Sequence, residues 1–241
     1  MTTCPYRALQ VRKDGVHRIE DTVCREETFA LRVNGELVTR MVASPDQLRE
    51  LGAGFVVSEG IADRVGEVEV RGYEIQVTAP GARRREAIIG TSCGVSLAGP
   101  TGRVHSALTL SPADVFQVAG EIETEEWRAT GGLHCSVLFT DGRLVARSGD
   151  VGRHNTVDKV IGRALLQGID LSRCILGCTG RQPAGMVAKA ARAGIPVIIS
   201  RAASTDRGIA AAEEAGITLI CFTRGERFTV YTHPERIPGI S

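Results

Sequence analysis

Residues 130–162 read TGGLHCSVLFTDGRLVARSGDVGRHNTVDKVIG and contain the pattern that decides the fold. Two apolar or alternating runs, 136–140 and 143–147, flank Asp141-Gly142, a dipeptide typical of two-residue β-hairpin turns. Outside these runs lie two clusters rich in glycine, histidine and charge, at 130–134 and 150–155. Because the strands of a hairpin are antiparallel, the sequence predicts that both clusters meet at one end of it.

A helix is predicted after the second cluster, because apolar residues recur at i, i+3, i+4 and i+7 from Val157 onward. Asp150 or Asn155 is expected to cap it. A helix that opens after a glycine turn presents free N–H groups, which suit a phosphate or another anion. The alternative is that the glycines only permit tight turns and that Asp158 and Lys159 lie on a solvated face. The convergence of two clusters favours a ligand site.

The chain before this hairpin is predicted to be mostly β structure. Asn34-Gly35 is expected to turn a second hairpin, and alternating residues predict strands at 66–71 and 73–79. Ser44-Pro45-Asp46-Gln47 has the composition of a helix start, with Ser44 as the cap. Ser111 is expected to cap another helix that continues to about residue 128.

Strands and helices alternate after residue 162, which predicts an α/β half with parallel crossovers. The predicted strands are 173–178, 195–200, 217–222 and 227–232, and the predicted helices are 183–192 and 206–215. Ligands bind beyond the carboxyl ends of such strands. The loops there contain 179–181, 200–201 and 223–227, and their arginines suit phosphate oxygens. Alternatively, Arg224 and Arg227 are surface charges of a hairpin.

Size and charge describe an ordinary globular protein. The chain has 241 residues, of which 43% are hydrophobic and 24% charged, with a formal net charge of +1 and a pI near 7.6. No strong positive field draws it to nucleic acid or to an anionic membrane. No apolar run is long enough to span a bilayer, and the first residues lack the apolar core of a signal peptide. We expect a cytoplasmic protein.

Seven cysteines are scattered without the spacing of a disulfide framework or a zinc ribbon. Cys174, Cys178 and Cys221 lie in apolar runs and are expected to be buried, and no metal site is expected. Cys93 differs, because it lies among glycines and small hydroxylated residues in GTSCGVSLAG (90–99). We expect an accessible thiol there, although an inert loop cysteine fits the chemistry about equally well.

Several motifs together resemble the formate dehydrogenase accessory sulfurtransferase (FdhD) family. In chain order they are TSCG (91–94), TGGLH (130–134), DVGRHNTVDKVIG (150–162), TGR (179–181) and FTRGERFTVYTHPERI (222–237). They cover nearly the whole chain. The GRHN-x-x-DK-x-IG block is far more specific than a glycine motif alone.

This resemblance implies a function and a fold. Members of the family take persulfide sulfur from a cysteine desulfurase and pass it to the molybdenum or tungsten bis-guanine-dinucleotide cofactor of formate dehydrogenase. The implied fold is α/β, with a cytidine-deaminase-like three-layer domain at 106–241 and a smaller, mostly β subdomain with the Cys93 loop at 1–105. The family also implies a homodimer.

The resemblance also implies site residues. Cys93 would bear the persulfide. The segment that would contact the cofactor consists of Phe222, Thr223, Arg224, Gly225, Glu226 and Arg227. The residues that would complete the pocket are Gly131, Gly132, His134, Gly152, Arg153, His154, Asn155 and Arg181.

One departure leaves alternatives open. Many members have a second cysteine three residues after the first, where this chain has Ser96. Either Cys93 alone suffices, which we favour, or another thiol such as Cys135 takes the second role, or the task has changed. A chaperone that delivers the cofactor without sulfur transfer is one alternative. A deaminase-like zinc hydrolase is another, but the His/Cys-Glu and Pro-Cys-x-x-Cys pattern it needs is missing from the sequence.

Overall fold

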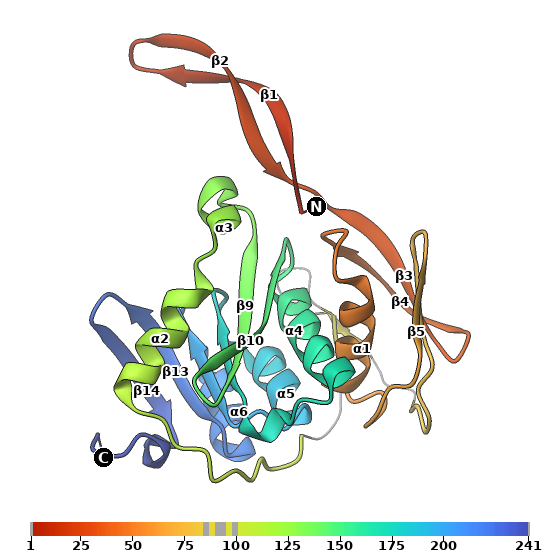
Figure 1. The fold of residues 1–241 in the computed structure, drawn as a ribbon, viewed down its shortest axis with the longest axis vertical. Coiled ribbons are helices and arrows are strands. Elements are labelled where there is room, and N and C mark those ends of the chain that lie inside the picture. The colour runs from red at the N-terminus through yellow and green to blue at the C-terminus, as the bar shows by residue number, and fades with distance from the viewer. Residues whose placement is uncertain (1, 84–86, 90–94, 98–100, 241) are drawn as a thin grey trace.

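The structure of the protein is a computed structural model that describes residues 2–83, 87–89, 95–97 and 101–240. Cys93 and most of the 90–99 loop therefore lie outside the described residues. The fold is mixed α/β, as the sequence predicts (Figure 1). Its centre is one six-stranded sheet with helices on both faces.

The six-stranded sheet has a parallel middle and antiparallel edges. Its strands, in spatial order, are β10 (Arg143–Asp150), β9 (His134–Thr140), β11 (Ile175–Cys178), β12 (Val197–Ser200), β13 (Thr218–Arg224) and β14 (Arg227–Thr232). β11, β12 and β13 are parallel, and the other pairs are antiparallel. The Asp141-Gly142 turn joins β9 to β10, and Asp150 pairs with His134. The hairpin thus brings the two polar clusters together, as predicted.

Alternating side chains of the sheet supply two hydrophobic cores. One face packs on α2 (Pro112–Ile122) through residues such as Val118, Val137 and Ile199. The other face packs on α4 (Arg153–Gln167), α5 (Ala184–Arg192) and α6 (Asp206–Ala215) through residues such as Leu138 and Ile198. These three layers form the larger part of the molecule.

A four-stranded sheet and one helix form the N-terminal part. The sheet order is β4 (Glu36–Ala43), β3 (Glu27–Val33), β6 (Glu74–Val77) and β5 (Val68–Arg71). Among the described residues, the hydrophobic core of this part lies within 29–79, and the sheet packs on α1 (Leu48–Ser58). A short ribbon of β7 (Ala87–Ile89) and β8 (Val95–Leu97) follows. The proposed division at residue 105 stays a prediction.

Two glycines bring α1 into backbone contact with α4 (Figure 1). A Cβ atom added to Gly54 would lie 1.7 Å from the carbonyl oxygen of Asp158, and one added to Gly162 would lie 1.9 Å from that of Glu50. No larger residue fits at either position without separation of the helices. The contact attaches the N-terminal sheet to the central one.

The first two strands form an arm that projects from the rest of the molecule. β1 (Thr3–Arg12) and β2 (Gly15–Cys24) pair only with each other among the described strands (Figure 1). Near its base, β2 contacts the short helix α3 (Glu125–Thr130). The arm then runs into β3.

Two predicted helix boundaries are wrong. α1 begins at Leu48 after Gln47, which has a left-handed backbone, and Ser44 does not cap it. Ser44 is instead buried, where its N–H donates to Asp150 Oδ2 and its hydroxyl accepts the N–H of Val151. The helix capped by Ser111 ends at Ile122 rather than near residue 128, because a new cap at Thr124 starts α3. No helix in the described part of the chain is long and apolar enough to cross a membrane.

Candidate functional site

The candidate site lies along one edge of the six-stranded sheet. The carboxyl ends of β11, β12 and β13 meet there, together with the start of β9 and the end of β10. Thr179 follows β11, and its hydroxyl accepts the N–H of Cys135 at 3.0 Å and lies 3.2 Å from His134 Nδ1. Two separate cavities open along this edge.

The first, which we call the histidine cavity, has a volume of about 580 Å³. It lies between β4 and the start of α4. Its lining residues are Glu26, Thr39, Arg40, Met41, Val42, Phe55, His134, Val151, Gly152, Arg153, His154, Asn155 and Asp158. It therefore joins the two clusters of the hairpin with a wall from the N-terminal sheet.

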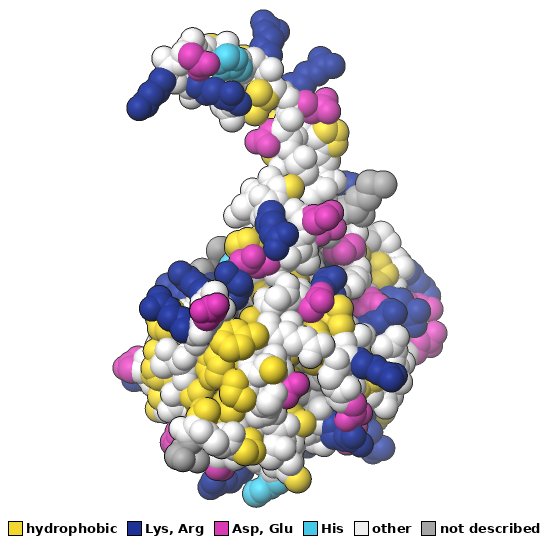
Figure 2. Space-filling model, turned by 60° about the vertical axis from the view of Figure 1, so that its left-hand side comes forward, with side chains coloured by type: hydrophobic (Ala, Val, Ile, Leu, Met, Phe, Trp, Pro, Cys, Tyr) yellow, Lys and Arg dark blue, Asp and Glu magenta, His cyan; other side chains and the backbone are white. Residues whose placement is uncertain are grey.

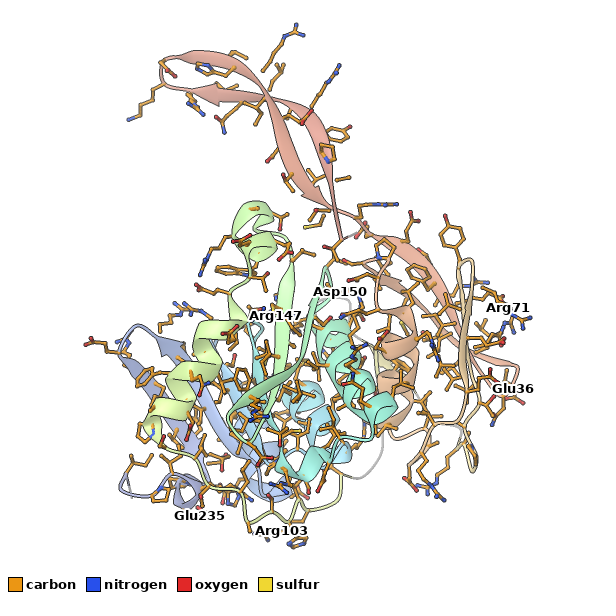
Figure 3. The ribbon with its side chains drawn as sticks, viewed as in Figure 1. Glu36, Arg71, Arg103, Arg147, Asp150 and Glu235 are labelled. Carbon is orange, nitrogen blue, oxygen red and sulfur yellow. The ribbon has the colours of Figure 1, made fainter. Side chains whose placement is uncertain are left out.

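The start of α4 is held by Asp150, although Asp150 is not its cap (Figure 3). The cap residue is Gly152, without a capping side chain, so neither predicted cap is correct. Asp150 Oδ1 accepts the N–H of Gly152 and the amide of Asn155, both at 2.8 Å. Asn155 also donates to the carbonyl oxygen of Val42 at 2.8 Å. The turn is thereby fixed to the edge strand β4.

His154 is a partly buried, neutral side chain at this cavity, and its Nδ1 atom is shielded from solvent. Its Nδ1 atom has no hydrogen-bond partner in the described structure. Burial lowers the pKa of His154 to about 3, and the positive charges of Lys189 and Arg153 and the nearby His134 add to this effect. Burial, with Arg153, also lowers the pKa of His134. Both rings can therefore exchange hydrogen bonds with a ligand while they stay uncharged at neutral pH.

A buried network of charges lies directly beneath the cavity. Lys189 Nζ is 2.6 Å from Glu59 Oε1, 2.8 Å from Asp158 Oδ1 and 3.1 Å from Ser58 Oγ. Burial raises the pKa of Asp158 to about 6 against the opposing effect of Lys189. Burial alone would lower the pKa of Lys189, but Asp158 and Glu59 together raise it.

Asp158 and Lys159 are both 1% exposed, so the alternative of a solvated helix face is wrong. Lys159 points to a second buried group, in which its Nζ lies 2.6 Å from Asp150 Oδ2 and 2.8 Å from Asp46 Oδ1. The same amine donates to the carbonyl oxygen of Ser44 at 3.2 Å. Lys159 thus holds α4 against the chain segment between β4 and α1, whereas Asp158 connects α4 to the end of α1 and to α5.

The second cavity, which we call the arginine cavity, has a volume of about 270 Å³. Its lining residues are Phe116, Ala119, Gly120, Arg201, Thr223, Arg224, Gly225 and Glu226. Arg224 Nε donates to the carbonyl oxygen of Arg201 at 3.1 Å, and Arg201 pairs with Glu123 at 2.6 Å. Thr223 is 1% exposed, and its hydroxyl has no partner in the described structure.

The predicted site residues are distributed unequally between the cavities. His134 and residues 152–155 line the histidine cavity, and residues 223–226 line the arginine cavity. The predicted residues that line neither of the two are Phe222, Arg227, Arg181, Gly131 and Gly132. Gly131 ends α3, and Gly132 lies against the sulfur of Cys24. Cys93 lies outside the described residues.

Some lining residues are absent from the prediction. The wall formed by residues 39–42 and the ring of Phe116 carry no signal in the sequence that separates them from ordinary strand and helix residues. Nothing in the sequence marks Lys189 as buried either, because it is one charged residue in the predicted helix 183–192. Arg201 could be placed only as part of a loop at a strand end.

Four of the six cysteines in the described part of the chain are buried, including Cys174, Cys178 and Cys221 as predicted. Burial raises the pKa of Cys135 to about 12 and that of Cys221 to about 12. Cys135 is therefore a poor source of thiolate, which weakens its candidacy as a second sulfur-handling group. Cys4 and Cys24 are partly exposed. Among the described residues, no group of three or more His, Cys, Asp or Glu side chains is arranged to hold a metal ion.

Acid sensitivity offers a test of the neutral state of His154. The unfolded chain takes up a proton near the ordinary pKa of 6.5, whereas folded His154 does so only near 3. Between these values acidification therefore destabilises the folded state through His154, by up to about 1.4 kcal/mol per pH unit. We expect His154→Asn to remove this contribution, as measured by urea unfolding of both proteins across this range. An equal loss of stability in both proteins would show that folded His154 takes up its proton as readily as the unfolded chain does.

Comparisons with known families, sequences and structures all lead to the same family. The model of the FdhD/NarQ family matches residues 24–238. The sulfur carrier protein FdhD of Methanothermobacter thermautotrophicus is 33% identical over 244 residues, which cover 93% of this chain and 94% of the relative. The protein of the same name from Thermoplasma volcanium is 52% identical over 253 residues, with 90% of each chain covered. A crystal structure from Desulfotalea psychrophila, described as a formate dehydrogenase accessory protein, superposes with a TM-score of 0.84 at 28% identity, over 98% of this chain and 100% of that one.

Proposed function

Because this chain belongs to the FdhD/NarQ family, we propose that it is a sulfur carrier for formate dehydrogenase. The observation that carries the proposal is the match over nearly the whole chain to proteins named sulfur carrier protein FdhD. In this proposal Cys93 takes sulfur from a cysteine desulfurase, and the acceptor is the molybdenum or tungsten bis-guanine-dinucleotide cofactor of the dehydrogenase. The transfer takes place in the cytoplasm, and the carrier is a homodimer.

Loading of Cys93 is a thiol exchange that needs no external oxidant. The Cys93 thiolate attacks the outer sulfur of the desulfurase persulfide, so that one S–S bond forms as another breaks and the desulfurase thiolate leaves. Release of that sulfur as sulfide needs two electrons. Ser96 cannot supply them, so we assign this role to an external thiol, which forms a disulfide with Cys93 as sulfide leaves.

The arginine cavity fits the guanosine diphosphate end of the cofactor. Arg201 and Arg224 are suited to phosphate oxygens, since a guanidinium group can donate two parallel hydrogen bonds. The buried hydroxyl of Thr223 lacks a partner, which a ligand can supply. The aromatic ring of Phe116 borders the same cavity and offers an apolar surface to a base.

The histidine cavity is suited to another part of the same cofactor, or to the groups that take part in the transfer of sulfur. It contains neutral rings at His134 and His154, the guanidinium of Arg153 and the amide of Asn155. Such a set can bind a polar ligand that carries partial negative charge and can donate hydrogen bonds to it. It lies on the same sheet edge as the arginine cavity.

Mass analysis tests the sulfur carrier function directly. The purified protein is incubated with a cysteine desulfurase and cysteine, and its intact mass is then measured without reductant. We expect a gain of one sulfur atom, located in the peptide that contains Cys93. If Cys93 stays unmodified while the desulfurase is active, the proposal is wrong.

The position of Ser96 also supports a second candidate function. Without a neighbouring cysteine, the chain could hold the cofactor and deliver it to the dehydrogenase without transfer of sulfur. This chaperone function needs the same cavities but not the Cys93 thiol. It therefore predicts normal cofactor binding and a dispensable Cys93.

Binding of guanosine diphosphate tests the assignment of the arginine cavity. Removal of a guanidinium that contacts phosphate costs a charge-assisted hydrogen bond, so we expect Arg224→Ala to raise the Kd about tenfold or more. Isothermal titration calorimetry measures this change. Arg64→Ala, at an exposed arginine outside both cavities, is the matched control and should leave the Kd unchanged. Equal affinities of both variants would exclude Arg224 from the nucleotide site.

A further inference from the structure

The arm formed by β1 and β2 has an incomplete structure by itself. A two-stranded hairpin is marginally stable in water, and three or more strands are usually needed. Four large apolar side chains of the arm are strongly exposed: Tyr6 (66%), Leu9 (66%), Val11 (76%) and Val16 (64%). Figure 2 shows the arm projecting away from the remainder of the molecule. In addition, each strand of a two-stranded sheet has an outer edge of unpaired N–H and C=O groups, which can pair with a further strand.

The two open edges of the arm differ in their ability to accept a strand. β1 contains Pro5, which has no N–H to donate, and prolines occur on edges that are not extended. β2 contains no proline between Gly15 and Cys24. Its outer edge has no strand partner in the described structure. β2 is therefore the edge that can be extended.

The charges of β2 are arranged so that they complement the same strand in a second copy. Most basic side chains of the arm lie toward its tip, together with one acidic side chain, and other acidic side chains lie nearer its base (Figure 2). In β2 itself, His17 and Arg18 precede Ile19, and Glu20 and Asp21 follow it. An antiparallel copy of this strand reverses the order, so that opposite charges meet. We therefore propose that β2 pairs antiparallel with β2 of a second copy of this chain, with Ile19 opposite Ile19 of the partner subunit.

Symmetry and charge together select this register. A two-fold axis perpendicular to a sheet keeps each side chain on its own face, so it must pass through a pair of identical residues. Centring on Ile19 places Arg18 opposite Glu20 of the partner subunit and His17 opposite Asp21 of the partner subunit. Centring on Arg18 or on Glu20 would instead bring like charges together, which is destabilising.

The resulting four-stranded sheet would also use the apolar side chains of the arm. Within one arm Val11 pairs with Val16, and Ala8 pairs with Ile19. In the proposed register these pairs become rows across the new sheet, with two isoleucines at its centre. Neither Arg18 nor Glu20 makes an ion pair within its own chain in the described structure, whereas His17 lies 3.2 Å from Asp14. The charges that decide the register are thus available.

Charge reversal tests the interface by sedimentation equilibrium. By symmetry each change affects two contacts, so we expect Arg18→Glu or Glu20→Arg to raise the dimer Kd about tenfold or more. The double variant Arg18→Glu/Glu20→Arg should restore the wild-type value. Arg64→Glu, on the body of the molecule, is the control and should have no effect.

Three results would overturn the proposal: a monomeric wild-type protein, single variants that dimerise as well as wild type, or a double variant that is not restored. The second result would mean that the dimer forms through another surface. This inference rests on the proposed homodimer, which a monomeric protein would also overturn. The measurement does not depend on sulfur transfer, so none of the three results bears on the role of Cys93 as a sulfur carrier. Oxidative cross-linking of Ile19→Cys gives a separate readout, since only a residue at the two-fold axis faces itself. The wild-type protein, with its partly exposed Cys4 and Cys24, is the control for that reaction.

Discussion

Replacement of Cys93 with serine is expected to leave formate dehydrogenase as inactive as it is without the carrier. A serine hydroxyl has nearly the same size as the thiol but cannot form a persulfide, so the sulfur has no carrier. The measurement is dehydrogenase activity after maturation with desulfurase, cysteine and either form of the carrier. We expect this to be the largest effect of any single substitution, because the chain has no second cysteine at position 96 to take over.

Two further variants make this result specific. Cys135→Ser removes a buried thiol whose pKa is raised to about 12, and Cys24→Ser removes a partly exposed one. Both are expected to retain maturation. Full activity with Cys93→Ser would favour the chaperone function, provided that the variant still binds guanosine diphosphate. Loss of activity with Cys24→Ser would instead identify that thiol as a second participant.

A single methyl group at Gly54 is expected to cost about 3 kcal/mol or more of folding stability. The added Cβ atom would meet the Asp158 carbonyl oxygen at 1.7 Å, so α1 and α4 must separate. An alanine inside a helix normally stabilises by about 0.5–1 kcal/mol relative to glycine, so the steric effect outweighs the gain in helix propensity. Urea unfolding of Gly54→Ala and wild type measures the difference.

Gly120→Ala is the matched control for this prediction. Gly120 also lies inside a helix, α2, but a Cβ atom there would meet nothing within 4 Å. We expect it to be neutral or slightly stabilising. A tolerated Gly54→Ala would mean that the two helices can move apart without loss of packing. The same contact positions Phe55 and Asp158 at the histidine cavity, so the variant should also weaken ligand binding there.

The central hairpin and the strand-helix alternation could be predicted because local chemistry determines them. Asp141 and Gly142 both adopt the positive φ values that their turn requires, and Ser111 makes a capping box with Asp114. In such cases a few neighbouring residues specify the conformation. The pairing of Asp150 with His134 then follows from the antiparallel register.

The failures of the prediction have a common physical origin in contacts between distant segments. Ser44 resembles a helix cap, yet its hydrogen-bonding groups are used by Asp150 and Val151, about a hundred residues away. Lys159 resembles a surface charge until two carboxylates from separate segments surround it. The wall of the histidine cavity could not be foreseen for the same reason. It depends on how β4 docks against α4, which local sequence does not specify.

The fully buried amine of Lys189 has a consequence for how the molecule comes apart. It is held by one carboxylate from the N-terminal part, Glu59, and one from the C-terminal part, Asp158. If these parts separated while each stayed folded, Glu59 would lose the Lys189 amine, and Lys189 would keep Asp158 as its remaining carboxylate. A buried pair that loses one partner leaves an uncompensated charge, which is strongly destabilising. Denaturation should therefore follow a single cooperative transition, in which neither portion persists as a native-like intermediate.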